Sequence, residues 1–344
     1  MSAHDLLAVE VSKDIKFTFT DSGPPNAENY TTLILVHGHT YHAGVFKKLG
    51  PLAKASSVRI ICVNRREYGG STPHTPEELR VYKTGTEAER TTLMSKEGLN
   101  LALCIDAIIQ KCALQAAGHV ALVGWSLGNM FTMAAMSSIA SLPHDAKKRL
   151  QESIKTFILW DPPSQALGIE NPENAYVPLY DMTIPDDARG PAFGVWVASY
   201  FTHDLAVHDE KNLQRKPQEN PPNPPTFHDL PFDQLLAITD FSVGDKCDTI
   251  VTEPTFKGVV NAIIEKALFE PATREASGYP KIAYMWGEAN AWNVPWAVWD
   301  IEKRVKDAKG KAPITFHPIP GANHFLMWED DSKAVEALIE CTKA

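Results

Sequence analysis

The sequence predicts an α/β fold, with a mostly parallel central sheet that is flanked by helices. Apolar runs at residues 33–36, 58–63 and 120–123 alternate with helical patterns between about residue 15 and residue 161. Strands that alternate with helices favour a parallel sheet, because each crossover helix returns the chain to the same end of the sheet. No repeat of fixed period is visible, which disfavours a solenoid.

A second block of the same kind begins at about residue 280. It supplies an apolar strand at 282–286, a helix that starts near Pro295, a strand at 314–319 and a final helix at 331–342. We therefore expect one core made of residues 1–161 and 279–344, interrupted by an insertion at 162–278.

The insertion is longer than a crossover between two strands needs, so we expect it to form a mainly helical cap over the sheet edge. Residues 191–207 are rich in aromatic side chains at mixed helical spacing, and 256–269 form a second candidate helix. Between them, the proline-rich residues 217–225 predict an extended, exposed linker. The aromatic helix has two interpretations, packing onto the core or forming a wall of a substrate pocket.

A candidate nucleophile follows the third apolar run. Gly124-Trp125-Ser126-Leu127-Gly128 separates the strand at 120–123 from a helix-compatible run of small residues. A serine at such a sharp turn has a strained backbone that exposes its hydroxyl, and the following helix N-terminus stabilises negative charge beside it. We predict that Ser126 is a nucleophile; the competing interpretation is a structural turn serine.

A serine hydroxyl alone is a poor nucleophile, so a base is expected elsewhere in the chain. His324 lies in the loop between the strand at 314–319 and the last helical segments. We hypothesise that His324 is this base. His317, within the strand itself, is a weaker competitor.

Four motifs occur in order along nearly the whole chain, and together they resemble those of the α/β-hydrolase superfamily. They are Leu33-Ile34-Leu35-Val36-His37-Gly38, Asn64-Arg65-Arg66-Glu67-Tyr68-Gly69-Gly70-Ser71, Gly-Trp-Ser-Leu-Gly at 124–128 and Gly-Ala-Asn-His-Phe at 321–325. The resemblance implies a serine nucleophile followed late in the chain by a histidine base. It also implies an oxyanion hole made by the backbone amides of His39 and Leu127.

The sequence departs from the family pattern at the acid that orients the histidine. The family usually has an aspartate four residues into a Gly-x-x-Asp motif after the penultimate strand, where this chain has Asn290. Some members carry the acid after the strand that follows the nucleophile helix, and there this chain has Asp161 before two prolines. We favour Asp161 as the acid, with Glu288 as the alternative. Asp161 has a second interpretation as a strand-ending turn residue.

The same motifs suggest which aromatic side chains line the pocket. We expect Trp196 and Tyr200 of the insertion, Trp125 and Phe325 beside the catalytic candidates, and Trp292 near the loop that carries Glu288. For Trp292, packing of a helix onto the sheet is the competing interpretation, because Trp292, Trp296 and Trp299 recur at helical spacing.

Composition excludes several function classes. The net charge of −9 and the lack of a Lys/Arg run argue against nucleic acid as a partner. No apolar stretch is long enough for a membrane helix, and the charged residues within 1–16 leave no signal-peptide core. Five cysteines without a Cys-x-x-Cys pair indicate reduced thiols, so we expect a cytoplasmic protein. The histidines at 37, 39 and 42 lack carboxylate or cysteine neighbours, so no metal is expected.

We therefore expect a serine hydrolase that cleaves an ester, lactone or thioester of a bulky apolar small molecule through an acyl-enzyme, without a cofactor. The serine disfavours epoxide hydrolase or haloalkane dehalogenase chemistry, which needs a carboxylate nucleophile. Two alternatives stay open: a non-hydrolytic enzyme of the same fold (a lyase, acyltransferase or perhydrolase), and a ligand receptor with negligible turnover.

Overall fold

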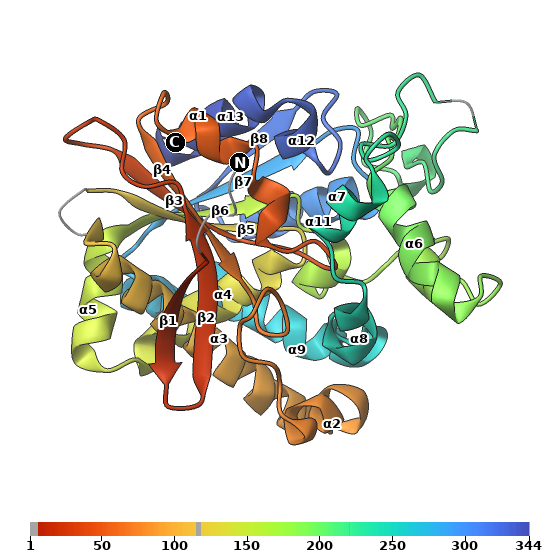
Figure 1. Cartoon of the computed structure of the whole chain (residues 1–344). Helices are drawn as coiled ribbons and strands as arrows, with labels where there is room; N and C mark the ends of the chain where they lie inside the picture. Colours follow the sequence, from red (N-terminus) through yellow and green to blue (C-terminus); the bar gives the residue numbers. More distant parts are fainter. Residues whose placement is uncertain (1–5, 115–117, 220, 344) are drawn as a thin grey trace.

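A twisted sheet of eight strands runs through the middle of the computed structural model (Figure 1). The structure describes residues 6–114, 118–219 and 221–343. The first five residues, for which no signal peptide was expected, and residue 220 of the expected linker lie outside the described part. The strand order is β1-β2-β4-β3-β5-β6-β7-β8. Their bounds are β1 Leu7–Ser12, β2 Ile15–Asp21, β3 Thr31–Val36, β4 Val58–Asn64, β5 Val120–Trp125, β6 Ile154–Trp160, β7 Lys281–Gly287 and β8 Ile314–Ile319.

The sheet is parallel from β4 through β3, β5, β6 and β7 to β8, and β2 pairs antiparallel with both of its neighbours, β1 and β4. The central strands β4 and β5 are buried at every residue, as expected for parallel strands covered on both faces. The predicted mostly parallel α/β sheet is therefore confirmed. Because parallel strands end at the same edge, the loops after β5, β6, β7 and β8 gather there.

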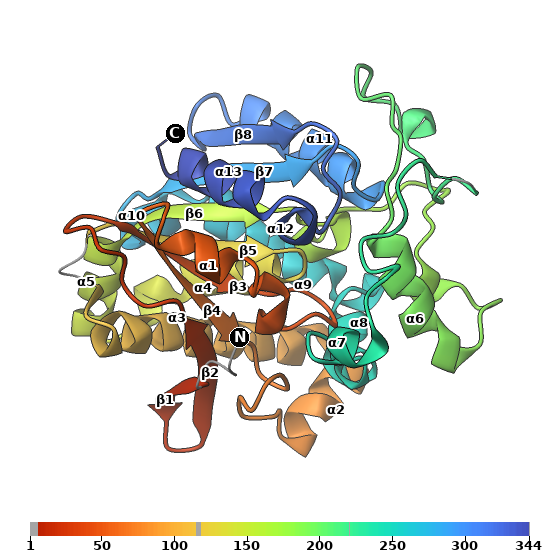
Figure 2. The same cartoon turned by 45° about the horizontal axis from the view of Figure 1, so that its top comes forward.

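Helices cover both faces of the sheet. Figures 1 and 2 show α1 and α13 side by side on one face and α3, α4 and α5 on the other, with α9 packed against α3 and α4. Capping boxes at Thr75 and Thr86 fix the starts of α2 and α3. The helix bounds are α1 Leu49–Ala53, α2 Pro76–Thr84, α3 Glu87–Lys111, α4 Gly128–Ser138, α5 His144–Ser153, α6 Asp186–Val197, α7 Phe232–Leu236, α8 Thr249–Val251, α9 Pro254–Ile264, α10 Pro271–Ala276, α11 Asn293–Asp307, α12 Leu326–Glu329 and α13 Asp331–Lys343.

Between β6 and β7 the described residues form helices and loops and no strand. In Figure 1, α6 and α7 lie beyond the edge at which β5 and β6 end. The aromatic helix starts earlier than its pattern suggested: α6 spans Asp186–Val197, with Pro191 inside, and residues 198–207 are irregular. Pro191 lies past the first turn of α6, where it removes one amide donor from the hydrogen bonds of the helix. The last helices of the insertion, α9 and α10, approach the core helices α3 and α4 or their ends, and the cap boundary at 162–278 stays a prediction.

Among the described residues, no helix combines the length and the apolar character that a membrane crossing requires.

Candidate active site

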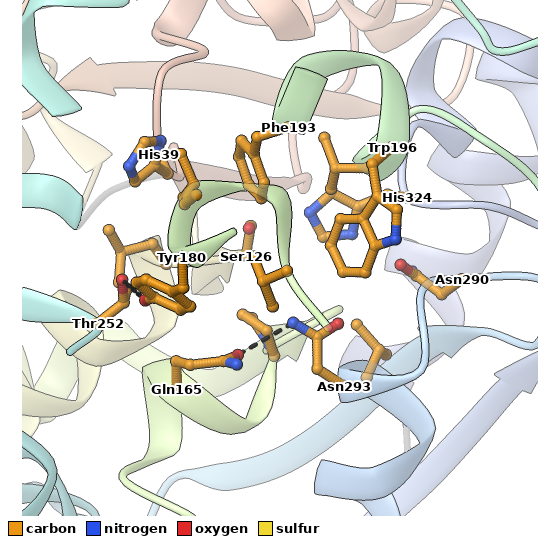
Figure 3. A pocket seen from close by; sticks show the side chains of 16 residues that line it. His39, Ser126, Gln165, Tyr180, Phe193, Trp196, Thr252, Asn290, Asn293 and His324 are labelled. Atoms are coloured by element: carbon orange, nitrogen blue, oxygen red, sulfur yellow. Dashed lines mark hydrogen bonds between the residues drawn. The ribbon is translucent and has the colours of Figure 1, made fainter. Parts of the chain in front are cut away.

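Ser126 occupies a sharp turn between β5 and α4. Its φ of 55° lies in the left-handed region, which is strained for a serine and holds the side chain out of the strand. Its backbone amide donates to the Trp160 carbonyl at 2.9 Å, so the end of the neighbouring strand β6 fixes the turn. The side chain is largely buried, yet it borders a cavity (Figure 3).

Two glycines allow the chain to pack tightly around this turn. A Cβ at Gly128 would lie 2.2 Å from the Val36 carbonyl oxygen, and one at Gly38 would lie 2.6 Å from the Cβ of Ser126. No side chain fits at either place without moving the backbone. The loop after β3 therefore passes directly beside the serine.

His324 lies in the loop between β8 and α12, and Trp125 packs against its ring. The Trp125 indole donates to the His324 carbonyl at 3.1 Å, and the two rings are 4.9 Å apart. Asn323 accepts the Phe325 amide and donates to the Ala198 carbonyl, which ties this loop to the insertion. Burial lowers the pKa of His324 to about 3, so the ring is neutral near pH 7, as a general base must be.

Asp161 follows β6 directly and faces His324. Its Oδ2 lies 3.6 Å from His324 Nδ1, and within the described residues neither atom has a hydrogen-bond partner. The Gly287 amide donates to the other carboxylate oxygen at 2.8 Å. Burial raises the pKa of Asp161, and the Gly287 amide opposes that shift. Contacts of this kind often tighten only when substrate binds.

Glu288, the alternative acid, forms no ion pair with His324 among the described residues. It is half-buried in the loop after β7, and in the part of the chain that the structure describes its side chain makes no hydrogen bond or ion pair. Its backbone amide donates to Ile319. The neighbouring Asn290 is fully buried and borders the cavity, with its Nδ2 lacking a partner among the described residues. Of the two candidate acids, the structure thus brings only Asp161 beside His324.

The two amides proposed for the oxyanion hole are free to bind a ligand. Within the described residues, the backbone N–H groups of His39 and Leu127 donate to no protein acceptor. Both residues border the cavity. The His39 ring itself is bonded to the hydroxyls of Thr40 at 2.7 Å and Thr249 at 2.9 Å, and burial lowers its pKa to about 4.

The cavity beside Ser126 is narrow, with a volume of about 40 Å³. On this measure one water molecule needs about 10–15 Å³, so the cavity has room for a few water molecules. In Figure 3 the sheet edge supplies Ser126 near the centre, Phe193 and Trp196 of α6 form the opposite wall, and Gln165, Tyr180 and Thr252 of the insertion border other sides. Its lining residues are His39, Ser126, Leu127, Pro163, Gln165, Val177, Leu179, Tyr180, Phe193, Trp196, Val197, Thr252, Asn290, Asn293, Val294 and His324.

Of the five aromatic side chains expected to line the pocket, Trp196 borders this cavity. The other four are not among the described residues that line it, and their place in a substrate pocket stays a prediction. Trp125 lies under His324 because successive residues at the end of a strand point to opposite sides. Phe325 is fully buried against Tyr41 and Phe227. Trp292 donates to the Tyr176 carbonyl at 2.7 Å and so supports the insertion from outside the cavity. Tyr200 follows the end of α6, where burial and the nearby Glu329 raise its pKa.

The sequence did not indicate several polar residues of the cavity. Asn293 donates to Gln165 at 3.0 Å, and the hydroxyls of Tyr180 and Thr252 are 2.5 Å apart. Each pair joins residues far apart in the chain, and three of the four residues belong to the insertion. No motif marks such pairs, because their partners are set by the fold alone.

One cluster outside the cavity resembles a metal site in composition. The side chains of His74, Glu78 and Glu97 lie close enough together to hold an ion. The Arg66 guanidinium, however, already donates to both carboxylates, at 2.7 Å to Glu97 and 2.9 Å to Glu78. A bound cation would have to displace Arg66, so the donor set fits an internal ion pair better than a metal.

A family model described as the alpha/beta hydrolase family matches residues 33–338. The chain belongs to this family. The comparison with curated protein sequences found no match. Similar solved structures include an esterase from Exiguobacterium antarcticum, with a TM-score of 0.54 and 13% identity over 98% of this chain and 99% of that one. A putative aryl esterase from Burkholderia cenocepacia has a TM-score of 0.53 and 15% identity, covering 98% of each chain.

Epoxide Hydrolase A from Mycobacterium thermoresistibile is also similar, with a TM-score of 0.51 and 16% identity over 99% of this chain and 98% of that one. At such identities the likeness concerns the fold, and members of this α/β-hydrolase family with the same fold differ in chemistry. The reaction must therefore be argued from the site of this chain.

Proposed function

We propose that this α/β-hydrolase is a serine hydrolase that cleaves an ester, lactone or thioester of a small molecule through an acyl-enzyme. The observation that carries the proposal is the arrangement at the sheet edge. A serine on a strained turn and a neutral histidine border one cavity, and a buried carboxylate lies 3.6 Å from the histidine. An epoxide hydrolase of this fold would need a carboxylate at the position of Ser126, so the site favours acyl chemistry.

The proposed reaction begins with attack of Ser126 Oγ on the substrate carbonyl carbon. Because His324 Nδ1 faces Asp161, its Nε2 is the nitrogen that accepts the serine proton. The amides of His39 and Leu127 hold the oxyanion of the tetrahedral intermediate. His324 then protonates the leaving alcohol or thiol, and the acyl group stays on Ser126. Water that loses a proton to His324 releases the acid.

The proposed substrate is bulky and apolar. Its support is the apolar wall formed by side chains such as Phe193, Trp196 and Val294. A cavity of about 40 Å³ is small for such a group, so the proposal includes movement of the apolar wall, of which α6 is a part, when substrate enters. We further propose a cytoplasmic location, on the support of five cysteines that are all free thiols.

A labelling and hydrolysis experiment tests the proposal. The chain is treated with a fluorophosphonate probe and digested, and the modified peptide is identified by mass spectrometry; we expect the label on Ser126. Turnover of p-nitrophenyl esters in ¹⁸O-labelled water should then place one solvent oxygen in the released acid. Labelled Ser126 without solvent oxygen in the product would favour a transferase or lyase, and no labelling at all would favour a receptor.

A further inference from the structure

Arg65 binds the loop that carries the candidate oxyanion amide. It follows β4, and only 6% of its side chain is exposed. Its Nε donates to the His37 carbonyl at 3.1 Å and its Nη2 to the Gly38 carbonyl at 2.9 Å. Its own backbone amide donates to the His37 ring at 3.0 Å. Two of these bonds hold consecutive peptide groups of the loop, and the third holds the His37 ring.

The bond to Gly38 has a direct consequence for the oxyanion hole. The Gly38 carbonyl and the His39 N–H belong to the same planar peptide group, which is trans because no cis peptide occurs in the described residues. In a trans peptide the C=O and N–H bonds point in opposite directions. Holding the Gly38 oxygen on Arg65 therefore turns the His39 N–H away from Arg65. A charged donor on the oxygen also polarises the peptide and strengthens its N–H as a donor.

Arg65 is in turn held by Asp248, which belongs to the insertion. The guanidinium donates to both carboxylate oxygens, at 3.0 Å and 2.5 Å, in a two-pronged geometry. Asp248 lies at the end of the short π-helical turn Gly244–Asp248, and its side chain is 1% exposed. Without Asp248 the guanidinium would be a buried charge lacking its counter-ion, and it would shift toward any remaining acceptor.

Two further contacts join the insertion to the same loop. The Tyr68 hydroxyl donates to Asp248 at 2.7 Å and accepts the Thr40 amide at 3.1 Å. Thr249, the residue after Asp248, bonds the ring of His39 at 2.9 Å. The loop is therefore held at Gly38, His39 and Thr40 by contacts that lead to residues 248–249 of the insertion.

We propose that Arg65 and Asp248 are positioning residues for the oxyanion hole, so that the insertion contributes to the chemical step as well as covering the cavity. The inference rests on the proposed function, because it needs an oxyanion to form. According to this inference, Arg65 and Asp248 stabilise the transition state, whereas an ordinary buried ion pair would affect only the stability of the fold.

The chain offers a matched control for that distinction. Arg59 and Asp21 form a similar two-pronged ion pair, with bonds of 2.9 Å and 2.5 Å and 9% of each side chain exposed. Its partners lie on β2 and β4, and it makes no hydrogen bond to residues 37–40. Loss of either pair should lower stability, but only loss of the first should disturb the oxyanion loop.

The test compares Asp248→Asn and Arg65→Lys with Asp21→Asn in the full chain. A short ester such as p-nitrophenyl acetate is the substrate, and active sites are counted by fluorophosphonate labelling. For both loop variants we expect kcat per labelled site to fall by about 10- to 100-fold, while KM changes by less than about twofold, because an oxyanion contact acts mainly in the transition state. Asp21→Asn should lower the melting temperature and leave kcat per labelled site within about twofold.

Tyr68→Phe covers the case in which a charge variant does not fold. It removes one hydroxyl and with it the bonds to Asp248 and Thr40, so kcat should fall by about 3- to 10-fold with KM unchanged. Unchanged kcat in folded Asp248→Asn or Tyr68→Phe, a loss confined to KM, or an equal loss in Asp21→Asn would overturn the inference. Wild-type protein that is not labelled at Ser126 would instead reject the proposed function and the inference with it.

Discussion

Ser126, Asp161 and His324 each lie within a few residues of a strand end, whereas Phe193 and Trp196 of the opposite wall lie on a helix with no strand next to it. The first group is held by the sheet through short covalent connections. Two of its members have φ angles in the left-handed region, 55° at Ser126 and 47° at Asp161, which only a firmly held backbone maintains. The second group is held by packing and, for Trp196, by one hydrogen bond from its indole to the Arg215 carbonyl at 3.0 Å. We infer that the sheet edge carries the reacting groups, and that the insertion sets access and size and, through Asp248, supports the oxyanion loop.

Loss of the proposed nucleophile should have the strongest effect on turnover. Ser126→Ala should lower turnover by about 10⁴- to 10⁶-fold, because members of a catalytic triad act as a unit. The protein should stay folded, since the change removes one oxygen from a side chain that borders a cavity. Ester hydrolysis and fluorophosphonate labelling measure the effect, and circular dichroism checks the fold. A variant that keeps a tenth of the activity would exclude Ser126 as the nucleophile.

The next largest effect concerns the acid. Asp161→Asn should lower kcat by about 10⁴-fold, because an amide favours the wrong tautomer of His324. Glu288→Gln is the matched control and should change kcat by less than about twofold, since no side-chain bond is lost. A large loss of kcat in Glu288→Gln, together with near wild-type kcat in Asp161→Asn, would show that the loops rearrange and that the acid comes from the loop after β7.

The structure brings together at the sheet edge the serine, histidine and aspartate that the sequence suggested, and their catalytic roles stay a prediction. A nucleophile turn needs small residues at fixed offsets from a strand and a helix, so Ser126 is visible in a short motif. The acid was narrowed only to Asp161 or Glu288, because the distance from each carboxylate to His324 depends on how three strand ends meet.

Contacts between residues far apart in the sequence were not predicted. Arg65 and Asp248 are 183 residues apart, and neither stands in a motif that names the other. The aromatic side chains show a different limit. Their helical spacing predicts an amphipathic helix, but it does not say whether a ring faces the cavity, as Trp196 does, or another part of the core.

A third prediction concerns the loop where the two regions meet. Burial, together with the charge of Arg65, lowers the pKa of His37, and burial lowers that of His39 to about 4. In the unfolded chain both titrate near 6.5, so between about pH 6.5 and pH 4 the unfolded state binds more protons. The free energy of unfolding therefore falls as the pH falls through this window. For His39 the loss amounts to about 3 kcal/mol at pH 4.

Urea unfolding at several pH values measures this loss. His39→Gln should flatten the dependence between pH 6.5 and pH 4 relative to wild type. Parallel curves for wild type and His39→Gln would mean that His39 is not held neutral by burial.

A fourth prediction tests whether the insertion sets the size of substrate that the cavity accepts. Phe193→Ala should enlarge the cavity and raise kcat/KM for long p-nitrophenyl esters relative to the acetate by about tenfold, because each added methylene that finds apolar contact gains about 1 kcal/mol or more. Val195→Ala is the control. Val195 lies on the same helix and is 58% exposed, so this variant should not change the ratio. Equal shifts in the two variants would show that general loosening of α6, and not cavity size, governs the preference.

The narrow cavity has a consequence for how affinities should vary across a substrate series. If the described conformation, with about 40 Å³ beside Ser126, is the dominant one, bulky esters bind only the fraction of molecules in which α6 has moved aside. The apparent dissociation constant of each bulky ester is then its intrinsic constant divided by that same fraction. All bulky esters share one common penalty, so their mutual ratios report on the open conformation. A ligand small enough for the closed form escapes the penalty and reports on the population itself.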